Sequence, residues 1–186
     1  MNAQMKSYSD IRDTIRTGDC IQWKSRGVIP WVIQRWSEYS HSSLVVRFDK
    51  YKDMKDRVFL IEALSGGLTF TLLSDRLQKS KGKAYLFQIR THYPDAEAML
   101  RRDASIALAS RIRYDFKGLF GNLLGRVSND ASRYFCSEFV WDKWRTSGML
   151  LGNMTALGLD MLGKEKAPRP GDIPLWVHGT TAEIAP

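Results

Sequence analysis

The sequence has few cysteines and no long apolar run. Its two cysteines, Cys20 and Cys136, among 186 residues exclude a framework of several disulfides, and a reducing compartment would keep both as thiols. No apolar stretch approaches the roughly 18 residues of a membrane-spanning helix, so we expect no transmembrane segment. Residues 1–19 lack the apolar core of a secretory signal. We therefore predict a cytoplasmic protein, with removal of a leader or export by another route left open.

Histidines are equally scarce. The three histidines, His41, His92 and His178, lie far apart, and none is spaced with a cysteine as a pair of metal ligands. We therefore predict no metal site.

Basic residues are in excess, 28 Lys and Arg against 20 Asp and Glu, which gives a net charge of +8. Such a charge favours anionic partners, including a cell-wall polymer, a membrane face or nucleic acid. The excess is scattered, however, and residues 50–57 alternate both signs. This pattern is more typical of a solvated surface than of a nucleic-acid stripe, so we expect no specific nucleic-acid partner.

The length and a hydrophobic content of 44% predict one domain over residues 1–186. Apolar periodicity and turn residues predict helices and strands that alternate along the chain. The expected helices are 7–16, 28–36, 94–112 and one that starts near Ser132; the expected strands are 20–23, 42–48, 57–64, 68–73 and 83–89. Residues 150–186 are rich in turns and are expected to pack back on the domain. Together, these elements predict an α+β fold, an antiparallel sheet with helices segregated from it.

The segment RYFCSEFVWDKW, residues 133–144, places Cys136 in or near the first turn of an aromatic-faced helix. Free backbone N–H groups and the helix dipole at that position favour a thiolate, which is the form of cysteine that acts as a nucleophile. The alternative is that Cys136 is one more small residue of the buried helix face, since cysteine is often buried. The helix alone favours this packing interpretation.

His41 is the best candidate for the base that would deprotonate the Cys136 thiol. It lies in EYSHSSLVV, at the entry to a β-branched strand, where an imidazole can reach the edge of a cleft. Glu62 follows in FLIEALSGG, between Leu60 and Leu64 on one strand face, where a carboxylate needs a partner. An imidazolium on a neighbouring hairpin strand would supply it. The alternatives are a histidine satisfied at a strand end and a glutamate that faces water from an edge strand.

Five motifs, in this order, resemble those of a known family. They are TGDCIQW, SHSSLVV, LIEAL, YDFKGLFG and YFCSEFV, and the resemblance covers residues 17–141. The chain resembles the circularly permuted branch of the NlpC-type papain-fold cysteine peptidases and amidases, the YiiX-like group. In the unpermuted members the cysteine helix precedes the histidine strand, whereas here His41 precedes Cys136.

The resemblance implies a papain-like fold, with Cys136 as nucleophile, His41 as general base and Glu62 as the acid that orients it. It matches Tyr114 to a tyrosine that lines the site or donates to an oxyanion, and it implies a structural role for Cys20. The reaction implied is attack on an amide or ester carbonyl through an acyl-enzyme, with no metal or organic cofactor. We expect a peptide-like or acylated substrate, with an anionic cell-wall or membrane surface as a further partner.

Other functions remain open at this point. The same fold could serve as a non-catalytic binding module, in which the cysteine, histidine and glutamate do not converge. A lipid acyl hydrolase or transferase would use the same residues on a different substrate. A basic nucleic-acid-binding protein is less favoured, and it would lose affinity steeply with salt.

Overall fold

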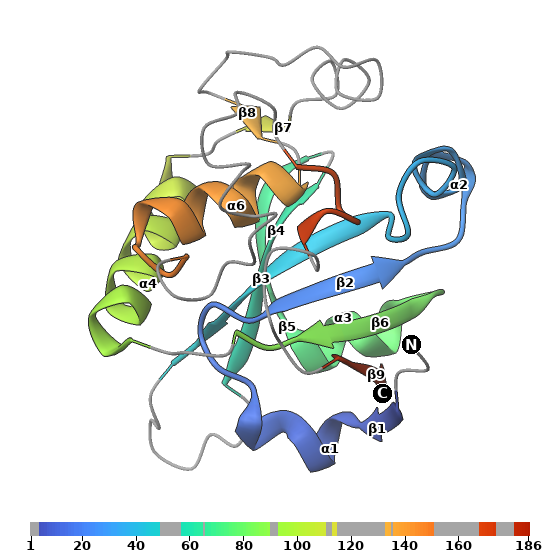
Figure 1. Cartoon of the computed structure of the whole chain (residues 1–186), viewed down its shortest axis with the longest axis horizontal. Helices are drawn as coiled ribbons and strands as arrows, with labels where there is room; N and C mark the ends of the chain where they lie inside the picture. Colours follow the sequence, from blue (N-terminus) through green and yellow to red (C-terminus); the bar gives the residue numbers. More distant parts are fainter. Residues whose placement is uncertain are drawn as a thin grey trace.

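The computed structural model describes residues 4–48, 57–64, 66–89, 93–110, 113–114, 133–134, 136–150, 168–173 and 181–186. Within this part, a seven-stranded sheet carries helices on both faces, and a separate two-stranded sheet lies next to its β4 and β5 strands (Figure 1). The strands are β1 (Gln4–Ser7), β2 (Cys20–Lys24), β3 (His41–Arg47), β4 (Val58–Leu64), β5 (Gly67–Leu72), β6 (Lys83–Phe87), β7 (Arg113–Tyr114), β8 (Arg133–Tyr134) and β9 (Thr181–Ala185). The helices are α1 (Tyr8–Ile11), the 3₁₀ turn η1 (Arg12–Thr14), α2 (Val28–Ile33), α3 (Leu73–Lys79), α4 (Pro94–Ala109) and α6 (Cys136–Thr146).

The strand order of the large sheet is β1-β9-β6-β2-β3-β4-β5, and every pair except the parallel β1–β9 pair is antiparallel. The predicted α+β class with a mainly antiparallel sheet is therefore confirmed. In the β3–β4 pair, Leu44 lies opposite Ile61 and Arg47 lies opposite Val58. Because β4 has neighbours on both sides, Glu62 lies in the interior of the sheet and not on an edge strand.

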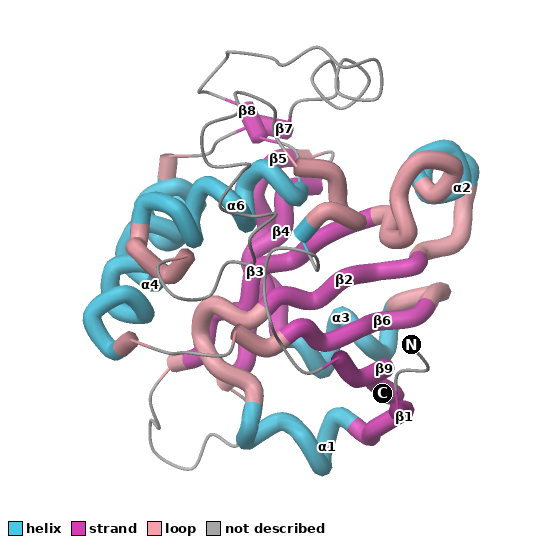
Figure 2. Tube along the Cα trace, viewed as in Figure 1, coloured by secondary structure: helices cyan, strands magenta, loops and turns pink. Residues whose placement is uncertain are grey.

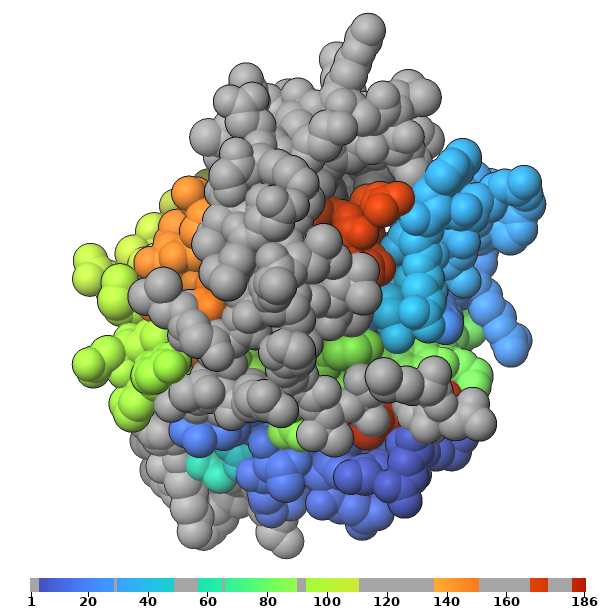
Figure 3. Space-filling view, viewed as in Figure 1, coloured from blue at the N-terminus to red at the C-terminus, as the bar shows by residue number. Residues whose placement is uncertain are grey.

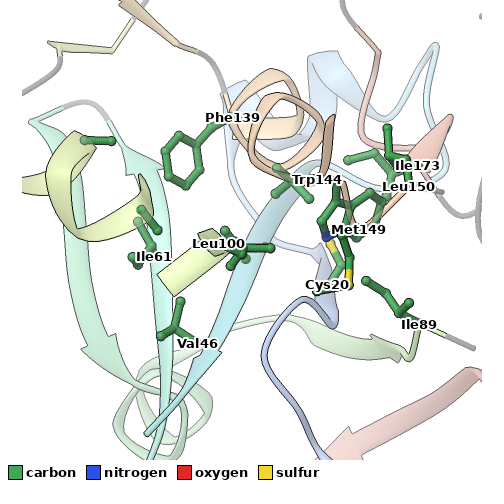
Figure 4. Close-up of a cluster of buried hydrophobic side chains, with 14 of the residues drawn as sticks. Cys20, Val46, Ile61, Ile89, Leu100, Phe139, Trp144, Met149, Leu150 and Ile173 are labelled. Carbon is green, nitrogen blue, oxygen red and sulfur yellow. The ribbon is translucent and has the colours of Figure 1, made fainter. Parts of the chain in front are cut away.

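Both faces of the sheet are buried, which explains why the central strands read as nearly continuous apolar runs. Side chains alternate along each strand, so neighbouring residues enter different cores. The first core packs the sheet against α4 and α6 (Figure 4) and includes Leu44, Val46, Ile61, Leu100, Phe139 and Trp144. The second core packs it against α1 and α3 and includes Ile11, Trp23, Val45, Leu60, Leu73 and Leu77. The sheet is thus the middle of three layers.

The turn before β2 joins the sheet to α6. Gly18 has φ +95°, a left-handed conformation that glycine adopts without strain. Its carbonyl oxygen accepts a hydrogen bond of 2.8 Å from Nε1–H of the fully buried Trp144. The Asp19 carboxylate accepts the backbone N–H groups of Arg16 at 2.8 Å and Ile89 at 3.0 Å. Burial raises the pKa of Asp19 to about 7, although these N–H groups act in the opposite direction.

The structure differs from the expected elements mainly at the ends of the sheet. Strands β1 and β9 and helix α3 were not predicted, because they are short and carry weak apolar patterns. Strand β9 pairs with both β1 and β6, which brings the two ends of the chain together (Figure 2). The expected helix at 94–112 ends at Ala109, and the one at 7–16 is divided into α1 and η1. Of the helices in the described ranges, none has the length and apolar character needed to cross a bilayer.

The Trp144 hydrogen bond predicts a stability effect. Replacing Trp144 with Phe should lower the free energy of unfolding by about 1–3 kcal/mol, because the buried Gly18 carbonyl loses its donor. Trp31→Phe is the control, since this ring is 60% exposed and should change stability by less than about 0.5 kcal/mol. Urea unfolding of the three proteins measures both values. Equal stability of the Trp144→Phe variant and the unsubstituted protein would contradict the prediction.

Candidate active site

Cys136 is the first residue of α6, and its side chain is 1% exposed. The helix begins four residues later than the expected start near Ser132, because Arg133 and Tyr134 form strand β8. Helix α6 packs on β3, so the sulfur lies beside the beginning of that strand. The backbone N–H groups of Ser42 and Ser137 both donate to the Cys136 sulfur. This environment stabilises a negative charge on the sulfur.

The imidazole of His41 lies between the sulfur and a carboxylate. It forms a side-chain hydrogen bond with Cys136, and its Nε2 lies 2.9 Å from Oε1 of Glu62. Because Nε2 is engaged by the carboxylate, Nδ1 is the nitrogen available to the thiol. The His41 side chain is only 13% exposed. The structure therefore brings together the three residues Cys136, His41 and Glu62 in one chain of hydrogen bonds.

The Glu62 carboxylate is completely buried and has two further partners. The hydroxyl of Ser43 donates to Oε1 at 2.8 Å, and Nε of Arg76 donates to Oε2 at 3.0 Å. Trp23 supports both partners: its Nε1–H donates to the Ser43 hydroxyl at 2.7 Å, and its ring lies 4.6 Å from the Arg76 guanidinium carbon. Three side chains, those of His41, Ser43 and Arg76, thus hold the Glu62 carboxylate in place.

Sequence reasoning missed Ser43, Arg76 and Trp23. Ser43 lies two residues after His41 on β3 and so shares its strand face. The alternation of side chains along the strand could therefore have predicted that Ser43 lies near His41. Arg76 had no such signal, because α3 itself was not expected. Its approach to Glu62 depends on how α3 packs under β4.

The charges of the site support one another. Burial disfavours the imidazolium of His41, but the Cys136 thiolate and Glu62 outweigh it and raise the His41 pKa to about 9. Burial likewise favours the neutral thiol, yet the His41 charge and the hydrogen bonds to the sulfur lower the pKa of Cys136. Burial also opposes ionisation of Glu62, but His41, Arg76 and Ser43 lower its pKa to about 2. These shifts all favour the ionised forms: a thiolate at Cys136, an imidazolium at His41 and a carboxylate at Glu62.

Cys20 has a different environment. It is fully buried, and burial raises the pKa of its thiol. Its sulfur accepts a hydrogen bond of 3.4 Å from the Gln22 side-chain amide, and it packs in the core beneath α6. Nothing in this environment stabilises a thiolate as the imidazolium does at Cys136.

Three further residues named from the sequence contribute no described side chain. The backbone of Tyr114 pairs with Tyr134 between β7 and β8, but its side chain lies outside the described part. His92 and His178 also lie outside the described residues. In the ranges that are described, no group of three or more His, Cys, Asp and Glu residues is arranged to hold a metal ion.

A sheet that carries a histidine and a glutamate, covered by a helix that begins with a cysteine, is the arrangement of a papain-like fold. The chain matches the family model described as "Permuted papain-like amidase enzyme, YaeF/YiiX, C92 family" over residues 14–171. The chain therefore belongs to this family, as its motifs predicted.

A solved structure supports the fold. The chain is 23% identical to the metalloprotein yiiX from Escherichia coli O157:H7, whose crystal structure it matches with a TM-score of 0.58. The match covers 91% of this chain and 96% of that chain. A comparison with curated proteins finds no match.

The two thiols should differ in reactivity. Iodoacetamide at about pH 6.5 should label Cys136 well before Cys20, because the imidazolium lowers the pKa of Cys136 whereas burial raises that of Cys20. The rate at Cys136 should stay nearly constant until the pH approaches the His41 pKa of about 9. Peptide mass spectrometry measures both rates. Faster labelling of Cys20 would contradict the electrostatic assignment.

The buried carboxylate also predicts how stability depends on pH. The pKa of Glu62 is about 2 in the folded protein, against 4.5 for an ordinary glutamate in the unfolded chain. Ionised Glu62 therefore favours folding above pH 4.5, and this contribution is lost as the pH falls toward 2. The difference in unfolding free energy between the unsubstituted protein and Glu62→Gln should shrink over that range. Glu183→Gln serves as a second acid variant for comparison, because the Glu183 carboxylate pairs at 3.0 Å with Lys83, whose side chain is 59% exposed. A constant difference at Glu62 would mean that its pKa is not depressed.

Proposed function

We propose that the protein is a cysteine hydrolase that cleaves an amide bond through an acyl-enzyme, with Cys136 as nucleophile, His41 as acid and base, and Glu62 as the orienting carboxylate. The observation that carries the proposal is the continuous hydrogen-bonded chain from the Cys136 sulfur through His41 to Glu62. Membership of an amidase family supports the reaction class. A peptide-like or acylated substrate fits that class.

The reaction begins with the thiolate. The Cys136 sulfur attacks the carbonyl carbon, and the electron pair of the carbonyl bond moves to the oxygen. When the tetrahedral intermediate collapses, the bond to nitrogen breaks and the Nδ1 proton of His41 passes to the leaving amine. The product that stays on the protein is a thioester of Cys136.

Hydrolysis of the thioester reverses the role of the histidine. His41 is now neutral and takes a proton from water as the water oxygen attacks the thioester carbon. Breaking the carbon–sulfur bond releases the acid and restores the thiolate beside the imidazolium. Glu62 keeps Nε2 protonated throughout, because it accepts the hydrogen bond from that nitrogen.

The developing oxyanion needs donors near the start of α6. The first backbone N–H groups of a helix have no partner within the helix, and Cys136 is the first residue of α6. We propose the N–H of Cys136 as one donor, which would contribute about 3 kcal/mol to transition-state stabilisation. Tyr114 stays a proposal for the second donor.

An acyl-enzyme predicts a burst. A panel of 4-nitrophenyl esters and acyl 4-nitroanilides should give a rapid release of one equivalent of chromophore per protein, and intact mass spectrometry should show the acyl group on Cys136. Cys136→Ala should abolish the burst, and Glu62→Gln should slow it by about 10²–10⁴-fold because the imidazole loses its orientation. Stopped-flow absorbance measures these rates.

Cys20→Ala is the matched control, because it removes the other thiol from the same core and should keep the burst. A protein that is acylated on Cys20, or that never acylates any panel member while its Cys136 thiol titrates near the ordinary pKa of about 8.5, would contradict the proposal. The second result would favour a binding module on the same fold.

A further inference from the structure

Helix α2 and the turn that follows it carry large apolar side chains into solvent at one end of the sheet. Val28, Trp31 and Trp36 are 79%, 60% and 52% exposed, and we call these three residues the α2 tip. The segment projects beyond the end of β2, on the opposite side of the molecule from α4 (Figures 1 and 3). Gly27, with φ +133°, allows the chain to turn into the helix. Trp31 and Trp36 belong to neither of the two hydrophobic cores.

Cationic side chains surround the α2 tip. The guanidinium of Arg35 lies 5.2 Å from the Trp31 ring centroid. The end of β2 and the start of β6 line an open hollow of about 590 Å³. We call its residues the basic hollow: Lys24, Arg26, Lys81, Gly82 and Lys83. Gly82 is required at this place, because a Cβ there would lie 2.2 Å from the Lys24 carbonyl oxygen. The hollow includes Arg26, two residues before Val28 of the α2 tip, and its side chains are all cationic.

The positive charge of the hollow is only partly balanced. Lys24 pairs with Glu38 at 3.0 Å, and Lys83 pairs with Glu183 at 3.0 Å. Within the described residues, Arg26 and Lys81 form no ion pair with a carboxylate. The hollow therefore has two cations available to an external anion. Its size suits a phosphate group together with part of its substituent.

We propose that the α2 tip and the basic hollow together form a docking surface for an anionic phospholipid bilayer. Tryptophan is the side chain that favours the boundary between headgroups and acyl chains, and Val28 adds an aliphatic contact at the same depth. Each Lys or Arg near an anionic leaflet is attracted by its negative surface potential. Charge complementarity selects this partner, because a leaflet surface offers anionic headgroups to the unpaired cations and an apolar layer to the exposed tryptophans.

The docking surface is connected to the candidate active site. Residues 168–173 join them: Arg169 donates to the Trp36 carbonyl oxygen at 3.2 Å, and the Gly171 N–H donates to the Ser37 hydroxyl at 2.7 Å. At the other end of this segment, the Ser137 hydroxyl donates to the Pro168 carbonyl oxygen, directly beside Cys136. This segment therefore links the docking surface to the residue that follows Cys136. This inference goes beyond the proposed hydrolase activity and does not depend on it.

Co-sedimentation with large unilamellar vesicles tests the proposal. The full chain should bind phosphatidylcholine vesicles that contain phosphatidylglycerol and should bind pure phosphatidylcholine vesicles at least about tenfold more weakly, since the leaflet charge is lost. Trp31→Ala combined with Trp36→Ala should weaken binding to the anionic vesicles by about tenfold or more. The matched control is Met99→Ala with Ile106→Ala, two apolar residues of α4 that are 49% and 53% exposed. This control should bind as the unsubstituted protein does.

A charge reversal tests the basic hollow separately. Arg26→Glu should weaken binding to anionic vesicles by about tenfold or more, whereas Arg102→Glu, an equal change of net charge on α4, should change it less than about threefold. Circular dichroism of every variant verifies folding. Cys136→Ser should bind vesicles normally, which separates this test from that of the hydrolase.

Three results would overturn the proposal. The first is an unsubstituted protein that does not bind anionic vesicles at low salt. The second is an equal loss of binding in the α2 and α4 variants. The third is a dimer in sedimentation velocity that the Trp31 and Trp36 substitutions dissociate, without vesicle binding, which would assign the surface to a second copy of the chain.

Discussion

A buried carboxylate organises this structure. Glu62 has no contact with solvent, so its charge must be compensated by groups that the fold itself supplies. Those groups come from separate elements: His41 and Ser43 from β3, and Arg76 from α3, with Trp23 of β2 behind the last two. Loss of register between β3 and β4, or displacement of α3, would leave the charge unpaired. The network therefore favours one relative placement of sheet and helix.

The same network explains how the site keeps charge in a region of low exposure. Removing water strengthens each interaction among the three groups and penalises each isolated charge. Glu62 stabilises the imidazolium, and the imidazolium stabilises the thiolate, so the ionised state of each depends on its neighbour. Cys20 shows the effect of burial without such a neighbour, because burial raises the pKa of its thiol. Proximity to His41, rather than burial, distinguishes the two cysteines.

The permuted order of the chain makes α6 responsible for completing the site. His41 and Glu62 are already joined in a hairpin, whereas Cys136 follows much later in the sequence. Helix α6 is held on the sheet by the core around Phe139 and Trp144 and by the hydrogen bond from Trp144 to Gly18. This bond connects the helix with the turn that precedes β2. A family whose unpermuted relatives place the cysteine first can therefore reach an equivalent arrangement from the opposite chain order.

The sequence by itself determined the central strands and the residues that meet between them. Apolar runs at 42–48 and 57–64 predicted β3 and β4, and their adjacency along the chain predicted that His41 and Glu62 would face one another, because consecutive strands usually pair. It also determined that Cys136 would lie at a helix start, although the exact first residue was misplaced, because the preceding residues join a strand. These features follow from local periodicity and short connections.

Only the tertiary structure decided the rest. The pairing of β9 with β1 and β6 joins opposite ends of the chain, and no local pattern records such a contact. The approach of Arg76 to Glu62 depends on the packing of α3, and the hydrogen bond between Cys136 and His41 depends on the position of α6 on the sheet. Composition determined the net charge, but only the fold placed Arg26 and Lys81 around one hollow. Contacts between distant segments are set by the shape of the whole core, which no single segment specifies.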